Sequence, residues 1–271
     1  MTEELMYGDA QSFPGFVWLV GAGPGATDLI TVRGLRLLQA AEAVVCDDLV
    51  DPGLLQNCPA ACERHFVGKR AGCHSASQSQ INALLVARAS AGQKVVRLKG
   101  GDPLVFGRAG EEMQALREAG IPYEIVPGVT AATAAAAAAG LPLTHREHSS
   151  AVVFVTGHQC AASTAATDWS ALARLRATLC FYMGVRRLPE IAANLTAHGM
   201  AADMPLAVIS EAARPAQQIL TGTLRDAEKL SAGLIGQPAL VVVGEVVRLA
   251  SFAATVPALR ARANPSVHVL R

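Results

Sequence analysis

Short apolar runs alternate with longer amphipathic stretches along most of the chain. The runs are rich in Val, Ile and Leu and show little of the alternation expected for half-exposed strands. Near-continuous apolar runs are typical of strands that are buried on both faces of a parallel sheet. The pattern predicts strands at residues 16–20, 43–46, 65–67, 94–98, 123–126, 151–156, 178–182, 205–209 and 239–243.

Helix signals lie between these strands. Thr31 can cap a helix that runs to Gln39, and Ser77 with Gln80 forms a capping-box pattern ahead of residues 81–89. Further helices are predicted at residues 110–119, 131–139, 169–175, 188–198 and 224–230. The alternation of strands and helices predicts a doubly wound α/β fold.

Composition narrows the classes of function. The chain has 271 residues, of which 51% are hydrophobic and 17% are charged, and its net charge is +1. This near-neutral balance gives no general attraction to nucleic acid or acidic membranes, so we expect neither as a partner. No apolar stretch has the length of a membrane span, and the first residues lack the features of a signal peptide, so we expect a cytoplasmic protein. The six cysteines are scattered, which predicts reduced thiols and no metal site.

Glycine-rich or polar clusters follow directly on nearly every predicted strand. They lie at residues 21–25, 47–48, 68–70, 100–103, 127–130, 157–158, 183–184, 211–212 and 244–245. Strand-to-helix loops always need such residues, which explains any single cluster. Acids, arginines and a lysine are also collected there, however, and open parallel sheets bind ligands beyond the carboxyl ends of their strands. The clusters therefore predict a ligand site at that edge.

Two of these loops suggest a cofactor. Residues 21–25 (Gly-Ala-Gly-Pro-Gly) partly match a dinucleotide-binding loop, with Asp47 at a suitable distance for a ribose. Pro24, however, has no N–H to offer a pyrophosphate, which argues against a nicotinamide cofactor. In residues 100–103 (Gly-Gly-Asp-Pro), the glycines allow close approach of a flat ligand and Asp102 offers an acceptor. The alternative for Asp102 is an Asp-Pro turn that closes the strand.

An ordered set of motifs resembles one known family. The motifs lie at residues 21–25, 67–70, 96–103, 106–112, 126–131 and 143–146. Together they resemble the uroporphyrinogen-III C-methyltransferases of the tetrapyrrole methylase superfamily, from about Val17 to about Val247. The resemblance implies two α/β domains, at residues 14–127 and 128–255, with a mostly parallel first sheet, a mixed second sheet, a cleft between them and a homodimer.

The family transfers two methyl groups from S-adenosylmethionine to uroporphyrinogen III. The products are precorrin-2 and S-adenosylhomocysteine, which feed sirohaem, cobalamin or haem d1 synthesis. By matching positions, the resemblance places the cofactor against Pro24, Gly100, Gly101, Asp102, Val105, Thr130, Ala131, Met183, Ala212 and Ala239. It implies catalytic roles for Asp47, Lys69 and Arg108, and substrate contacts for Arg70, Glu111, His145 and Arg146. A carboxylate such as Asp47 could accept a proton or stabilise positive charge on the attacking pyrrole.

Some alternatives stay open at this level. Without the resemblance, Asp47 is equally a solvated loop acid and Lys69 a surface charge. The chain also departs from the family at Ala26, at Asp48, where members commonly have Arg, and at residues 211–214, where many members have a small loop containing Gly. The rival functions are methylation of a later precorrin or cobalt-precorrin, a nicotinamide-dependent oxidoreductase, and a non-catalytic binding protein.

Overall fold

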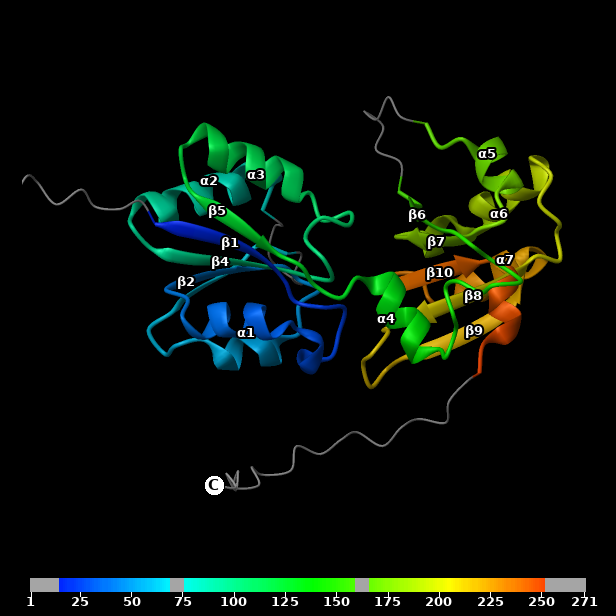
Figure 1. Ribbon diagram of the computed structural model, residues 1–271, viewed down its shortest axis with the longest axis horizontal. Helices are drawn as coiled ribbons and strands as arrows, with labels where there is room; N and C mark the ends of the chain where they lie inside the picture. Colours follow the sequence, from blue (N-terminus) through cyan, green and yellow to red (C-terminus); the bar gives the residue numbers. More distant parts are fainter. Residues whose placement is uncertain (1–14, 69–75, 159–165, 252–271) are drawn as a thin grey trace, which may run out of the picture.

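The first half of the chain forms a parallel five-stranded sheet. The computed structural model describes residues 15–68, 76–158 and 166–251. The first sheet has the order β3-β2-β4-β1-β5 and consists of β1 (Phe16–Gly21), β2 (Ala43–Cys46), β3 (Glu63–Phe66), β4 (Lys94–Lys99) and β5 (Tyr123–Val126). Figure 1 shows α1 (Val32–Gln39) on one face, and α2 (Gln78–Ser90) with α3 (Ala109–Glu118) on the other.

The second half forms a mixed five-stranded sheet. Its order is β6-β7-β10-β8-β9, with β6 (Val152–Thr156), β7 (Thr178–Tyr182), β8 (Pro205–Ser210), β9 (Gln218–Thr223) and β10 (Ala239–Val243). Only β6 and β7 are parallel, and the other neighbours in this sheet are antiparallel. One face packs against α4 (Ala131–Ala138), and the other against α5 (Trp169–Arg174), α6 (Leu188–Ala197) and α7 (Ala227–Ala232).

Local sequence signals account for several helix ends. Thr31 caps α1, because its Oγ1 accepts the N–H of Gly34 at 3.1 Å. The predicted capping box at α2 is confirmed, with Ser77 N donating to Gln80 Oε1 at 2.8 Å and Gln80 N donating to Ser77 Oγ at 3.3 Å. Short 3₁₀ turns complete the connections at η1 (Thr27–Leu29), η2 (Pro52–Asn57), η3 (Val185–Arg187), η4 (Leu224–Asp226) and η5 (Glu245–Leu249).

Among the α-helices and strands, two differ from the prediction in more than a shift of up to three residues at their ends. The strand β9 was not predicted, because Gln218, Thr221, Gly222 and Thr223 break up its apolar pattern. Such a sequence is tolerated because β9 is an edge strand that pairs only with β8. The single helix predicted at residues 224–230 is instead the turn η4 followed by α7, which ends at Ala232.

The direction of β10 changes which residues share a sheet edge. Since β10 runs antiparallel to both β7 and β8, its start lies beside their carboxyl ends. Ala239 pairs with Ser210 at this edge, whereas Val243 pairs with Leu179 and Leu206 at the other. The prediction that residues 244–245 join the other polar clusters is therefore wrong, because it assumed that every strand pointed the same way.

Each sheet has its own hydrophobic core on both faces. The clusters around β1, β2 and β4 contain residues of α1, α2 and α3, while those around β7, β8 and β10 contain residues of α4 to α7. Residues 127–130 connect the halves, and the division at 127/128 stays our proposal for the domain boundary. No helix in the described parts of the chain combines the length and apolar character needed to cross a membrane.

Candidate active site

A pocket of about 240 Å³ lies where the two sheets meet. It is formed by the loops after β1, β2, β4, β7 and β8, the segment that begins α4, and the start of β10. All ten residues predicted to touch a cofactor line it, and so does Asp47. Leu49, Phe106, Tyr182, Glu211, Arg214 and Pro238 also line it and were not predicted. Most of these lie within a few residues of a predicted position, which is the sequence signal that could have found them.

Backbone contacts between glycines form one wall of the pocket. Gly101 N donates to Gly23 O at 2.8 Å, and Gly23 N donates to Gly101 O at 3.2 Å. Gly101 has a φ of 71°, a conformation that favours glycine. A Cβ on Gly128 would lie 2.3 Å from Gly101 O and 2.7 Å from the Cα of Gly21. These glycines therefore let three backbone segments meet without intervening side chains.

Asp102 fixes this wall through both carboxylate oxygens. Oδ1 accepts the N–H of Leu104 at 2.9 Å, which makes the turn that the Asp-Pro sequence suggested. Oδ2 accepts the N–H of Gly128 at 2.9 Å, linking the loop after β4 to the segment before α4. The two interpretations of Asp102 are therefore compatible: it shapes the loop and also lines the pocket.

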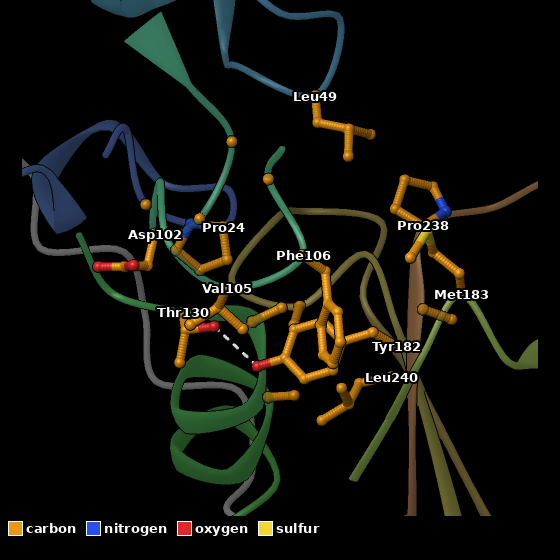
Figure 2. Close-up of a pocket in the computed structure, with 18 of the residues that line it drawn as sticks. Pro24, Leu49, Asp102, Val105, Phe106, Thr130, Tyr182, Met183, Pro238 and Leu240 are labelled. Carbon is orange, nitrogen blue, oxygen red and sulfur yellow. Dashed lines mark hydrogen bonds between the residues drawn. The ribbon is translucent and has the colours of Figure 1, made fainter. Parts of the chain in front are cut away.

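Two aromatic side chains, Phe106 and Tyr182, also line the pocket and lie against each other in Figure 2. The Tyr182 hydroxyl lies 2.7 Å from Thr130 Oγ1 and accepts the N–H of Ala132 at 3.1 Å. Burial raises the pKa of Tyr182, partly offset by these hydrogen bonds, so the phenol stays neutral near pH 7. The ring of Phe106 packs on Tyr182 with 4.9 Å between centroids. Phe106 and Met183 are themselves partly open to solvent at the rim of the pocket.

Unusual backbone conformations gather in the loops around the pocket. In the described parts of the chain, five non-glycine residues have positive φ: Phe106 (52°), Arg108 (57°), Met183 (55°), Glu211 (48°) and Ala213 (61°). Three of them line the pocket, and the other two are within two residues of a lining position. Such conformations cost free energy and persist where the surrounding structure holds them, often at functional sites.

Arg214 joins the two halves at the pocket. It donates to the carbonyl of Leu49 at 2.7 Å, and to the Glu211 carboxylate at 2.9 Å. The loop after β8 also lies against the loop after β1, because a Cβ on Gly25 would be 2.7 Å from Ala212 O and 2.8 Å from Arg214 Cγ. The departure from the family at residues 211–214 therefore coincides with a contact between the halves.

Behind Asp47 lies a cluster of buried charges that the sequence analysis did not assign. Arg97 NH2 donates to Asp47 Oδ1 at 2.5 Å, and Arg97 Nε donates to Glu112 Oε1 at 2.9 Å. Lys99 Nζ donates to the same Glu112 oxygen at 3.0 Å. Burial and the neighbouring Arg97 lower the pKa of Lys99, more than the carboxylates of Glu112 and Asp47 raise it. The only signal in the sequence was that Arg97 and Lys99 are cations at buried positions of β4, whereas Lys94 at its start is exposed.

The remaining predicted residues are not all brought to the pocket. Arg108 and Glu111 form a two-pronged ion pair, with both N–O distances 2.7 Å, on the surface beside the pocket residue Gly107. Lys69 and Arg70 lie outside the described residues. Gly68, which precedes them, packs on the backbone of Asp48, since a Cβ there would be 2.6 Å from Asp48 N.

His145 and Arg146 lie at the far edge of the second sheet. His145 forms a bridge with Ser149, whose Oγ is 3.0 Å from Thr178 Oγ1 at the start of β7. The pocket residues Tyr182 and Met183 are at the other end of that strand. The structure therefore does not bring His145 and Arg146 to the pocket, and their contacts with the substrate stay a prediction.

The loop that contains His145 also holds a possible set of metal ligands. The ligand atoms of His145, Glu147 and His148 all lie within 4.8 Å of one another. It is the one such group in the described parts of the chain. Glu147 and His148 are exposed, and the group lies away from the pocket, so it has no role in the site described above.

The sequence matches a known protein family and curated proteins. The sequence matches the family described as Tetrapyrrole (Corrin/Porphyrin) Methylases over residues 17–228. A siroheme synthase from Gluconacetobacter diazotrophicus is 50% identical over 235 residues, which cover 86% of this chain and 50% of the relative. The chain thus spans about half the length of the curated relatives it matches.

Solved structures share the whole architecture. Uroporphyrin-III C-methyltransferase from Thermus thermophilus, complexed with S-adenosylhomocysteine, has a TM-score of 0.74 and 38% identity, covering 87% of this chain and 100% of that one. A cobalt-precorrin-4 methyltransferase has a TM-score of 0.78 and 29% identity, covering 88% and 98%. The two-sheet fold, the match to the family and these identities together show that the chain belongs to the tetrapyrrole methylases.

Proposed function

We propose that this protein transfers two methyl groups from S-adenosylmethionine to carbon atoms of uroporphyrinogen III, giving precorrin-2 and S-adenosylhomocysteine. The observation that carries the proposal is the pocket between the sheets, which is lined by every residue that the family resemblance assigned to the cofactor. The similarity to the uroporphyrin-III C-methyltransferase of Thermus thermophilus supports this choice of substrate.

The lining of the pocket suits S-adenosylmethionine in its chemistry. At about 240 Å³ the pocket is at the small end of ligand cavities, so it would enclose only a small molecule, and a tetrapyrrole macrocycle would stay at the mouth. Ala131, Ile209 and Leu240 give an apolar surface for an adenine ring. The glycine loop at residues 100–101 and the Asp102 carboxylate offer backbone and side-chain polar groups for hydroxyls and an amine.

The rim provides groups that suit a tetrapyrrole. Leu49, Phe106 and Met183 are exposed apolar side chains at the opening, where they can hold a macrocycle and exclude water. When bound, S-adenosylmethionine supplies the methyl group from its sulfonium. Asp47 is placed at the pocket to stabilise positive charge on the attacking pyrrole or to accept the proton that it loses. We propose that Arg108, on the surface beside the pocket, meets a substrate carboxylate by exchanging its ion pair with Glu111, since arginine is well suited to bind carboxylates.

One structural similarity supports a rival function, the methylation of a later corrin intermediate. The cobalt-precorrin-4 methyltransferase superimposes with a TM-score of 0.78, so methylation of a later corrin intermediate uses the same fold. The lower identity of 29% favours uroporphyrinogen III over this alternative. Nicotinamide binding is disfavoured because Pro24, which has no N–H, faces the pocket where a pyrophosphate would need donors.

Methyl transfer to defined tetrapyrroles tests the proposal. The protein is incubated with S-adenosylmethionine labelled in its methyl group and with uroporphyrinogen III, and the products are weighed by mass spectrometry. We expect a product with two added methyl groups, and a large loss of product in Asp47→Asn. Transfer to a cobalt-precorrin but not to uroporphyrinogen III would establish the rival, and binding of S-adenosylhomocysteine without any transfer would indicate a non-catalytic member.

Asp48 provides a second arm of this experiment. It is exposed beside Asp47 and places a negative charge where the family commonly has Arg. If this charge weakens binding of an anionic substrate, Asp48→Arg should lower KM for uroporphyrinogen III. We also propose a homodimer and a cytoplasmic location, which gel filtration with light scattering and cell fractionation respectively would test.

A further inference from the structure

Four charged side chains form a continuous chain from the core of the first half to the pocket. Arg97 and Lys99 of β4 and Glu112 of α3 are almost completely buried, at 2%, 2% and 0% exposure. Asp47 is the outermost member, with its side chain 31% exposed, and it lines the pocket. Burying a group of charges this deeply is expensive, and well-packed apolar residues often stabilise a core as well or better. Stability alone therefore does not explain the cluster.

The geometry fixes the orientation of the Arg97 guanidinium. Its Nε donates to Glu112 and its NH2 to Asp47, while NH1 lies 3.3 Å from the carbonyl of Val45 and 3.4 Å from that of Leu98. The strand register produces this arrangement, because Arg97 is directly opposite Val45 on β2. Acceptors on several sides of a planar group leave it little freedom to rotate.

Asp47 is held at one oxygen only. Its Oδ1 receives the hydrogen bond from Arg97, whereas Oδ2 receives none from the described residues. The carboxylate is therefore anchored from behind and presents its other oxygen at a pocket-lining position. Two cations and two carboxylates balance within the cluster, so removing one member leaves an unbalanced charge beside the pocket.

We propose that Arg97, itself held by Glu112, is a positioning residue that aims the Asp47 carboxylate at the reacting tetrapyrrole. Arg97 does not line the pocket, so it acts through Asp47. Holding a catalytic group within a narrow range of orientations contributes to rate, and its loss lowers kcat more than it weakens ground-state binding. This inference rests on the methyl transfer proposed above.

The first measurement compares Arg97→Met and Arg97→Lys in the full chain. We expect Arg97→Met to lower kcat at least tenfold while the Kd for S-adenosylhomocysteine, from calorimetry, changes less than threefold. Arg97→Lys keeps the positive charge but lacks the planar guanidinium, so its kcat should lie between that of Arg97→Met and that of the wild type. If Arg97→Met does not fold, Arg97→Lys alone tests the proposal. An unchanged kcat in both variants would overturn the proposal. So would a parallel fall in kcat and in affinity for S-adenosylhomocysteine that Arg97→Lys does not partly reverse.

A double-mutant comparison separates positioning from general disruption. In an Asp47→Asn background, Arg97→Met should cause no further loss of single-turnover rate, because Arg97 acts only through the Asp47 carboxylate, which that background already lacks. An equal further loss in both backgrounds would overturn the proposal. Lys99→Met tests the inner end of the same cluster: Lys99 bonds the Glu112 oxygen that also holds Arg97, so the effect of its removal should likewise be smaller in the Asp47→Asn background.

The wild-type assay separates this inference from the proposed function. If wild-type protein transfers no methyl group to uroporphyrinogen III, the proposed function fails. If the wild type is active and the Arg97 variants match it, only the positioning role fails. Where Asp47→Asn transfers no detectable methyl group, the comparison of Met and Lys at position 97 decides alone.

Discussion

Asp102 Oδ2 accepts the backbone N–H of Gly128 at 2.9 Å, and this hydrogen bond joins the loop after β4 to the segment that leads into the second half. The same two loops also meet through their glycines, since Gly128 packs against Gly101 O. The wall of the pocket on this side is therefore backbone held by one carboxylate. Its shape depends on contacts that a single added methyl group can disturb.

Gly128→Ala should disrupt the pocket strongly. The new Cβ would lie 2.3 Å from Gly101 O and 2.7 Å from the Cα of Gly21, both parts of the backbone that cannot move cheaply. We expect a loss of about 3 kcal/mol in the free energy of unfolding, and at least tenfold weaker binding of S-adenosylhomocysteine. Urea unfolding and calorimetry measure the two. Gly110→Ala, on α3 with nothing within 4 Å of the new Cβ, is the control and should be neutral or slightly stabilising.

Tyr182→Phe should weaken the junction between α4 and the second sheet. It removes the hydroxyl that lies 2.7 Å from Thr130 Oγ1, and leaves the buried N–H of Ala132 without that acceptor. The expected cost is about 1 to 3 kcal/mol in the free energy of unfolding. Tyr123→Phe is the control, because the Tyr123 hydroxyl makes no hydrogen bond to the described residues. Equal stability of the two variants would contradict the prediction.

Arg214→Ala should speed release of the cofactor product. The side chain joins Leu49 of the first half to Glu211 of the second, and all three residues line the pocket. Without it, we expect the dissociation rate of S-adenosylhomocysteine to rise severalfold in stopped-flow measurements, with a smaller change in the association rate.

Arg248→Ala provides a matched control for that experiment. Arg248 pairs with Glu245 at the same spacing and the same 2.9 Å as Arg214 with Glu211, but it lies at the other edge of the second sheet. Its removal should leave cofactor release unchanged. Similar rates for the two variants would show that Arg214 does not hold the pocket closed.

The buried thiols should be unreactive in the folded protein. Burial raises the pKa of Cys180 to about 12, and burial together with the neighbouring Cys62 raises that of Cys58 to about 11. Both thiols therefore stay protonated at pH 8, and alkylation by iodoacetamide should be slow until urea unfolds the chain. Mass spectrometry of tryptic peptides measures the modification.

The same shifts predict the sign of a pH effect on stability. A thiol whose pKa is higher in the folded than in the unfolded state holds its proton more tightly when folded. Its contribution is complete below the ordinary value of 9.0 and is lost as the pH rises toward 11 to 12. Stability measured by urea unfolding should therefore fall between pH 9 and these values, and the slope should decrease in Cys180→Ala. No change of slope in that variant would contradict the assignment.

The sequence by itself determined most elements and the position of the site. Residues 43–46, 123–126, 178–182 and 239–243 were predicted as strands with the bounds that the structure has. Three of them are nearly continuous apolar runs, as strands buried on both faces need, and the edge strand at 123–126 is marked by its β-branched and aromatic residues despite Glu124. The loops at residues 21–25 and 100–103 were found because glycine marks places where backbone must come close. These signals are local, so they can be read along the chain.

Only the tertiary structure decided how distant residues pair. The register that places Arg97 opposite Val45 assembles the buried cluster with Glu112 and Asp47, and no pattern along the chain specifies it. The reversed direction of β10 brings Ala239 to the pocket and moves residues 244–245 away from it. Arg214 donates a hydrogen bond to the carbonyl of Leu49, which is 165 residues earlier in the chain. Strand direction, register and contacts between the halves depend on how whole elements pack, because the free energy of each pairing is set by partners that are remote in sequence.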